Sequence, residues 1–158
     1  GRWLERVGER DEARVAAHFA RAGAGHVAAI HYARAANQAL LAGDADAALE
    51  RVARGLSCGP DERVQGWLRI LEADARERRC EPSLALRAAT EAAHRLREVD
   101  GAPDDRYDEA ALAILRAGRH LGWLEASAPD LNAPEGRAEL QEQLALVEQR
   151  LAMQGGTG

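Results

Sequence analysis

The side chains that most often carry out chemistry are scarce in this chain and are widely spaced. Its histidines form no H-E-x-x-H motif and no pair at positions i and i+4, the spacings by which a helix holds zinc. They are His18, His26, His31, His94 and His120. Cys58 and Cys80 have neither C-x-x-C nor zinc-type spacing. We therefore expect free intracellular thiols, no metal and a cytoplasmic chain.

The other candidate sites lack residues that their chemistry requires. Gly23-Ala24-Gly25 has no preceding strand and no third glycine for a dinucleotide loop, and a chain without lysine has no Walker motif. The acidic cluster at residues 104–109 lacks the glycine-bearing loop of an EF-hand. We expect its carboxylates to stabilise the start of a helix instead. The three serines adjoin turns, with no histidine and aspartate nearby in the sequence, so we expect neither catalysis nor a cofactor.

The composition is that of an ordinary globular domain. Of 158 residues, 46 % are apolar and 30 % are charged, with the two signs interleaved. A formal charge of −5 argues against a nucleic-acid or anionic-membrane surface, and the chain has no apolar run long enough to span a membrane. All 21 basic residues are arginine, which forms bidentate pairs with carboxylates more readily than lysine does.

Apolar residues recur every three or four positions, without the alternation of a β-strand. The five prolines stand where these patterns begin or end. We therefore expect an all-α fold of about seven helices, over residues 11–22, 26–42, 44–57, 61–79, 82–98, 104–123 and 134–153. Asp44 is well placed as an N-cap, and Pro82 stands near a first helical position. Residues 154–158 are expected to be a disordered tail.

Residues 29–62 form the clearest repeat unit, two helices joined by a turn. Tyr32 takes the bulky position of the first helix and Gly43-Asp44 the turn. Ala48 stands at the position where the two helices cross, and Pro60 stands at the end of the unit. This spacing resembles the tetratricopeptide (TPR) repeat of 34 residues.

The unit recurs in looser form along the chain. A second copy begins at Leu68 and is about three residues longer, with Cys80 in the place of the turn glycine. A third begins at Ile114, and the loop 125–133 replaces its turn. The resemblance implies a TPR-like α-solenoid of about three helix pairs over residues 11–153. An irregular helical bundle is the alternative.

The segments AAHFARAG, AIHYARAANQAL and GDADAALERVARGL also resemble the repeat region of large bacterial signalling proteins. In those proteins a serine/threonine kinase and an AAA-type ATPase module precede the repeats. Related repeats follow the nucleotide-switch modules of bacterial transcription activators. The likeness covers about residues 1–98. It implies a regulatory interaction domain, with the catalytic modules outside this chain and with residues 1–10 as a segment from the preceding domain.

In TPR-like solenoids the first helix of each pair lines a concave groove that takes extended peptides or partner helices. The repeat register carried over to this chain predicts eight groove residues. They are Arg34, Asn37 and Leu41 from the first pair, Arg69 and Arg76 from the second, and Arg116, Arg119 and Trp123 from the third. An arginine-rich groove suits an acidic peptide. The alternative is that these arginines are solvated or are paired with local glutamates such as Glu72.

Three functions fit these expectations, and the sequence names no partner. The first is a protein–protein interaction module that binds a peptide, a partner protein or other domains of a larger bacterial signalling protein. The second is a homodimerisation scaffold, joined through the apolar stripe of Trp3, Leu4 and Val7 or through the last helix. The third is a ligand-sensing domain of an ATPase-type transcription activator, with a closed pocket around Trp67 or Trp123.

Overall fold

The computed structural model describes residues 2–155, with side chains from residue 11 onward. Over this range the chain forms helices joined by turns and loops, without a β-strand. The seven helices of the range are α1 (Arg2–Arg21), α2 (Gly25–Leu41), α3 (Ala45–Ser57), α4 (Glu62–Arg78), α5 (Pro82–Leu96), α6 (Tyr107–His120) and α7 (Gly136–Gly155). The expected all-α fold is confirmed.

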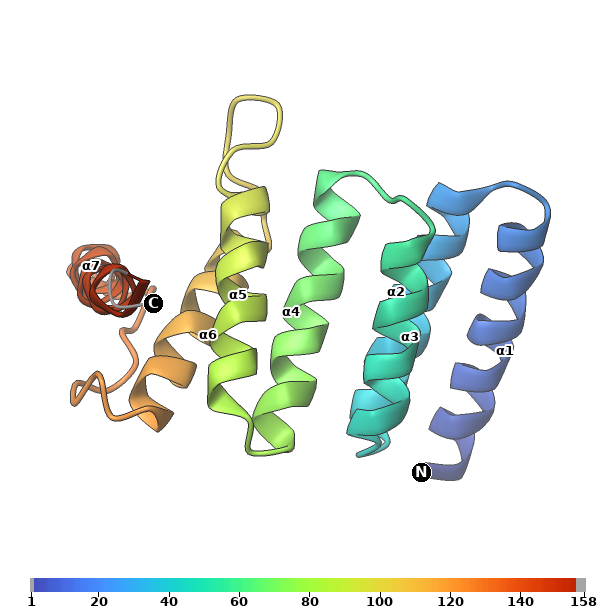
Figure 1. The fold of residues 1–158 in the computed structure, drawn as a ribbon, viewed down its shortest axis with the longest axis horizontal. Helices are drawn as coiled ribbons and strands as arrows, with labels where there is room; N and C mark the ends of the chain where they lie inside the picture. The colour runs from blue at the N-terminus through green and yellow to red at the C-terminus, as the bar shows by residue number, and fades with distance from the viewer. Residues whose placement is uncertain (1, 156–158) are drawn as a thin grey trace.

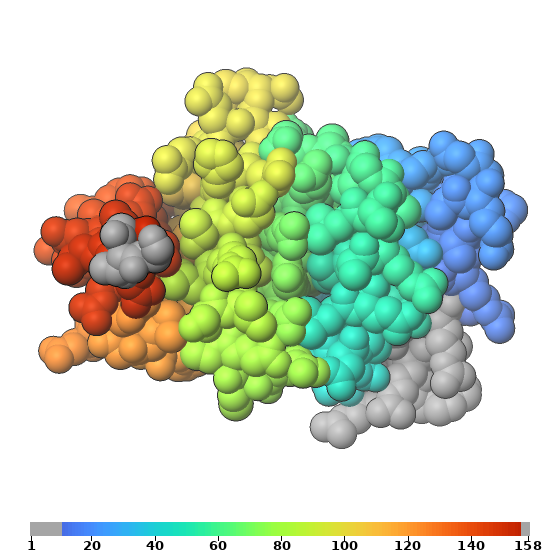
Figure 2. Space-filling view, in the orientation of Figure 1, coloured from blue at the N-terminus to red at the C-terminus, as the bar shows by residue number. Residues whose placement is uncertain are grey.

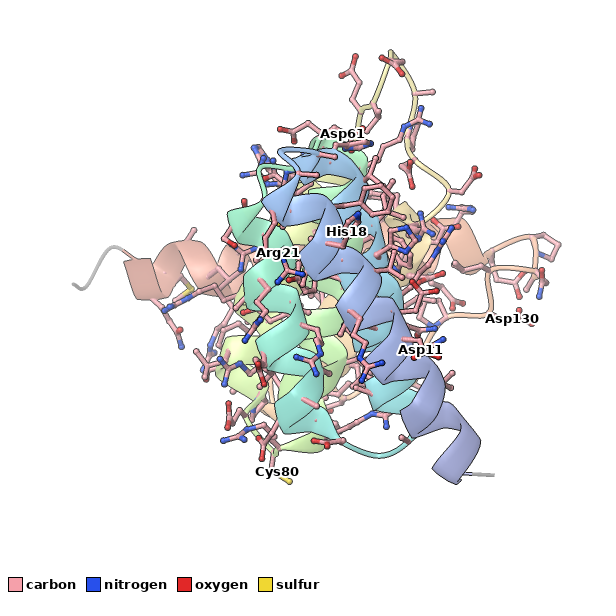
Figure 3. All side chains as sticks on the ribbon, turned by 90° about the vertical axis from the view of Figure 1, so that its right-hand side faces the viewer. Asp11, His18, Arg21, Asp61, Cys80 and Asp130 are labelled. Atoms are coloured by element: carbon pink, nitrogen blue, oxygen red, sulfur yellow. The ribbon has the colours of Figure 1, made fainter. Side chains whose placement is uncertain are left out.

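The first six helices run up and down beside one another, and α7 lies crosswise to them (Figure 1). Each helix packs against the next, and α4 also packs against α2 and α6. Helices α2, α4 and α6 thus form one layer, with α3 and α5 on the side toward the viewer in Figure 1. Asp61 before α4 and Cys80 after it lie at opposite edges of the stack, where the helices begin and end (Figure 3). This is the stacking of helical hairpins that a repeat requires.

Helices α1, α2, α4 and α6 end in the same kind of turn. Each is followed by a residue with positive φ, namely Gly23 (+80°), Gly43 (+78°), Cys80 (+59°) and Gly122 (+76°). The next N–H donates to the carbonyl five residues back, at 2.8 Å from Asp44 to Ala39. The same bond runs at 2.9 Å from Glu81 to Arg76. These are Schellman motifs, which satisfy the last carbonyls of a helix, and Cys80 takes the place of the turn glycine as expected.

Side-chain caps fix where α3 and α4 begin. Asp44 accepts the N–H of Ala47 at 3.0 Å, and Asp61 accepts the N–H of Val64 at 3.0 Å. Each bond satisfies a helix-start N–H that has no partner within the helix. Pro82 is the first residue of α5, where its missing N–H costs nothing. The expected roles of Asp44 and Pro82 are confirmed.

Three apolar clusters join the helices of the described range; a small one of Ala16, Ala28 and Tyr32 lies between α1 and α2, and alanine is frequent in the two larger ones. The first of the larger clusters joins α2, α3 and α4 and includes Ala48 and Leu68. The second joins α4, α5, α6 and α7 and includes Leu96 and Leu140. Small residues let the helices approach closely: a Cβ added at Gly66 of α4 would lie 2.5 Å from side-chain atoms of Leu96. The close crossing of α4 and α5 therefore depends on glycine at this position.

Helix α6 is shorter at both ends than the sequence predicts. It begins at Tyr107, because the Asp104 side chain accepts the N–H of Arg106 at 2.9 Å and holds the preceding residues in a turn. It ends at His120 because Gly122 takes a left-handed conformation. The loop that follows projects away from the stack at Asp130 (Figure 3).

Helix α7 packs across the end of the stack. Leu140, Leu144 and Val147 are buried in the second apolar cluster, the role of a capping helix that their spacing favours. The helix continues to Gly155, inside the segment 154–158 expected to be a disordered tail; the last three residues lie outside the described range.

At the other end, α1 is continuous from Arg2, so the expected boundary at residue 10 lies within a helix. The side chains of Trp3, Leu4 and Val7 lie outside the described residues. From residue 11 onward α1 packs against α2, where Glu12 Oε2 lies 2.6 Å from His31 Nδ1. Phe19 stacks on the same imidazole, with 5.5 Å between the ring centres.

Candidate partner-binding surfaces

The side of the α2–α4–α6 layer that faces away from α3 and α5 is termed the even-helix face. Arg34, Asn37 and Leu41 are exposed on α2, at spacings of three and four that place them on one side of the helix. The opposite side carries Ala36 and Ala39, which are buried in the cluster with α3. Leu41 is 63 % exposed. The three expected groove residues of α2 are therefore open to a partner.

A cleft of about 220 Å³ separates α4 from α6 on the even-helix face, and its lining includes Asp74, Glu109 and Arg116. Arg116 is exposed. The guanidinium of Arg78 in α4 already has partners within the chain, because it donates hydrogen bonds to Asp74 at 3.0 Å and to the carbonyl of Leu40 at 2.7 Å. On the even-helix face, the arginines without an ion pair to a described residue thus stand on α2 and α6, on either side of α4.

Arg69 and Arg76 lie on another side of α4, which corrects the expected groove. Both line one cleft with residues of α3 and a second cleft with residues of α5. Arg69 donates to Glu72 at 2.7 Å and Arg76 to Glu81 at 2.7 Å. The alternative for these arginines, pairing with local glutamates, is confirmed for Arg69 with Glu72 and for Arg76 with Glu81. The TPR register places these two arginines wrongly. Asp74 is the residue of α4 that faces α6, and it lies well around the helix axis from Arg69.

Trp123 also lies away from the even-helix face. It follows the left-handed Gly122 and lines a cleft of about 470 Å³ with residues of α5 and α7, open to solvent on one side. The Arg150 guanidinium lies 5.8 Å from the centre of its ring. Arg119 is half-buried, and its Nη1 is buried without a hydrogen bond to any described residue. Four of the eight expected residues share the even-helix face: Arg34, Asn37, Leu41 and Arg116.

Trp67, the other tryptophan considered for a pocket, is half-buried against the cluster of α2, α3 and α4. The guanidinium of Arg106 lies 4.4 Å from the centre of its ring, which is cation–π distance. This contact ties the turn before α6 to α4. Sequence reasoning missed it, because nothing local links two residues so far apart in the chain.

Arg87 is a further surface residue that the sequence did not single out. It is exposed on α5 and lines both the cleft at Trp123 and the neighbouring cleft at Arg69 and Arg76. It has no ion pair with a described residue. The TPR register could not find it, because that register assigns the groove to first helices, whereas α5 is the second helix of its pair.

The turn between α4 and α5 holds a network of charges. Glu81 accepts hydrogen bonds from Arg79 and Arg76 at 2.7 Å each. These bonds, with that from Arg79 the stronger influence, hold the pKa of the Glu81 carboxyl below its ordinary value. Arg79 also donates to Asp46 of α3. The network therefore links α3, α4 and α5 at the edge of the stack where Cys80 lies.

The acidic cluster at residues 104–109 has structural partners, as expected. Asp108 and Glu109 lie in the first turn of α6, where carboxylates stabilise a helix start. Arg137 of α7 donates to both carboxylate oxygens of Asp108, at 2.7 Å each. This pair raises the pKa of the Arg137 guanidinium and fastens α7 to α6.

The cysteines differ in exposure. Cys80 is exposed, whereas Cys58 is half-buried and its thiol donates to the carbonyl of Arg54 at 3.3 Å. Burial raises the pKa of the Cys58 thiol. Among the side chains that the structure describes, those of residues 11–155, no group of three or more His, Cys, Asp or Glu residues is placed to hold a metal ion. Nor does any helix of residues 2–155 have the length and apolarity needed to cross a bilayer.

No protein-family model matches this chain, and no curated protein or solved structure matches it either. The resemblance to TPR repeats therefore rests on the residues quoted above and on the order in which the helices pack.

Proposed function

We propose that this chain is a helical scaffold that binds a segment of a partner protein on its even-helix face, as a regulatory module of a larger bacterial signalling protein. The supporting observation is the group of Arg34, Asn37, Leu41 and Arg116, exposed on α2 and α6. Arginine is enriched at protein interfaces, and a partner bound at Arg34 would also cover Leu41, which is 63 % exposed on the same side of α2. The TPR-like stacking adds support, because such layers commonly present one face to a ligand.

Charge defines the class of partner. Arg34 and Arg116 form no ion pair with described residues, so a carboxylate brought to either would gain a charge-assisted hydrogen bond without breaking one. Leu41 offers an apolar contact beside Arg34. The proposed partner is a peptide segment that combines acidic residues with an apolar anchor.

A second candidate function, a homodimerisation scaffold, is favoured by a different surface. Leu146 and Met153 of α7 are 51 % and 65 % exposed, and their spacing of seven residues places them on one side of the helix. Two such stripes from two copies would bury each other. Light scattering of residues 1–158 across a concentration range separates the two candidates. A monomer favours partner binding, and a dimer that Leu146→Glu dissociates favours the scaffold.

The proposed function is tested by selecting phage-displayed peptides of about 12 residues on the wild-type protein. We expect selected peptides to carry Asp or Glu near a large apolar residue, and part of them to bind about tenfold more weakly to Leu41→Asp and to Arg116→Glu. Leu146→Asp is the matched control, an exposed leucine on α7, and should bind these peptides as the wild type does. If neither Leu41→Asp nor Arg116→Glu weakens any selected peptide, the even-helix face is not the binding site.

A further inference from the structure

We propose that a second docking surface, on the side of the stack opposite the even-helix face, takes an acidic amphipathic segment of a partner protein. This surface is a row of three clefts from α3 across α4 and α5 to α7, termed the odd-helix furrow. Figure 2 views the molecule from this side, with α3 and α5 toward the viewer. The proposal does not depend on binding at the even-helix face.

The three clefts form one continuous surface, because neighbouring clefts share wall residues. The first, of about 150 Å³ between α3 and α4, shares Arg69, Glu72 and Arg76 with the second. The second, of about 490 Å³ between α4 and α5, shares Arg87 and Glu91 with the third. The third, of about 470 Å³, reaches α7. A row of clefts over four helices suits an elongated chain segment better than a compact small molecule.

The two ends of the odd-helix furrow are apolar. Leu49 and Leu56 of α3 line the first cleft. The third cleft has Leu86, Trp123 and Leu151 in its walls. Its volume is within the range of about 300–1,000 Å³ in which pockets enclose drug-sized groups, so it has room for a large apolar side chain. A partner that inserted such an anchor would cover the exposed part of the Trp123 ring.

The middle of the furrow is lined by three arginines and two glutamates, and Arg87 is the arginine without an ion pair to a described residue. Arg69 and Arg76 are held by Glu72 and Glu81 at 2.7 Å each. Glu91, the other carboxylate of the middle cleft, accepts from Arg95 at 2.8 Å. Arg87 stands between the middle and third clefts without an ion pair to a described residue. A carboxylate placed next to the apolar anchor would meet this guanidinium.

Shape and charge together specify the occupant. It is a segment with a large apolar residue for the cleft at Trp123, a carboxylate for Arg87, and a second apolar residue toward Leu49 and Leu56. An amphipathic segment presents apolar and acidic residues along one side in this way. A basic segment would place a positive charge against Arg87, which has no carboxylate partner among the described residues, and would be repelled there.

The test uses the peptides selected on wild-type residues 1–158. Arg87→Glu reverses the charge of the free arginine, and Ser83→Trp adds an indole at an exposed position in the wall of the third cleft. Arg116→Glu is the matched control, the same charge reversal on the even-helix face. We expect a class of acidic peptides that bind about tenfold or more weakly to Arg87→Glu and to Ser83→Trp, and within twofold of wild type to Arg116→Glu. Circular dichroism of each variant checks that the helices are retained.

Each other outcome overturns the inference. If every selected peptide binds Arg87→Glu and Ser83→Trp as tightly as wild type, or if no peptide is selected, the furrow is not a docking surface. If Ser83→Trp abolishes binding while Arg87→Glu has no effect, the cleft takes a neutral apolar group and the acidic partner is wrong. Peptides weakened only by Arg116→Glu would support the even-helix face and reject the furrow, so the two proposals fail separately.

Discussion

At the scale of single residues, Cys80 is the one non-glycine residue among four equivalent turn positions. Its φ of +59° lies in the left-handed region, which costs an L-residue roughly 1–2 kcal/mol and costs glycine little. Glycine also gives the unfolded chain more freedom, which offsets part of that gain. We expect Cys80→Gly to raise the free energy of unfolding by about 0.5–1 kcal/mol, measured by urea titration. Gly43→Ala is the control and should lower it by about 1 kcal/mol; a less stable Cys80→Gly protein would contradict the explanation.

The sequence predicted part of the candidate site, and the limit is physical. Arg34, Asn37 and Leu41 were found because spacings of three and four place residues on one side of a helix. Arg69 and Arg76 share a side for the same reason, but spacing does not say toward which neighbours that side turns. The rotation of α4 is set by which of its residues α2, α3, α5 and α6 bury, and that depends on the whole stack. Arg87 was missed because it stands where two clefts meet, and the sequence does not show where clefts form.

At the scale of helices and turns, local signals predicted most of the fold. Asp44, Pro82 and the turn glycines act within a few residues of the chain, so their effects are visible in sequence. The start of α6 was placed too early, because the hydrogen bond that Asp104 accepts competes with helix formation in a way that apolar periodicity does not register. The crosswise direction of α7 was not predictable, since it results from packing across α5 and α6.

The turn between α4 and α5 gives a prediction about acid sensitivity. The pKa of Glu81 is lowered in the folded protein by hydrogen bonds from Arg79 and Arg76. Its contribution to stability is therefore present above the ordinary glutamate pKa and is lost as pH falls through the lower, folded-state value. We expect Glu81→Gln to melt at a lower temperature than wild type at neutral pH, and the difference to shrink as the pH falls below the ordinary glutamate pKa and through the lower, folded-state pKa. A melting-temperature difference that stays constant over this range would show that Glu81 acts through packing alone.

At the scale of the whole molecule, the core is divided. Of the two larger apolar clusters, one joins α2, α3 and α4 and the other joins α4, α5, α6 and α7, so α4 is common to both; a third, small cluster joins α1 to α2. In stacked repeats each unit depends chiefly on its neighbours, so damage stays local, whereas a globular bundle loses stability as one unit. A destabilising substitution should therefore affect only the neighbouring helices in a solenoid, but every helix in the irregular bundle that is the alternative.

Leu140 provides that measurement, because its side chain is fully buried where α7 meets the second cluster. Leu140→Ala should cost about 2–5 kcal/mol locally. In hydrogen exchange we expect the amides of α6 and α7 to lose protection, while those of α2 and α3 exchange as in the wild type. Val52→Ala, in the first cluster, is the converse control and should expose α2 and α3 more than α7. Equal loss of protection in every helix after either change would establish a single cooperative bundle.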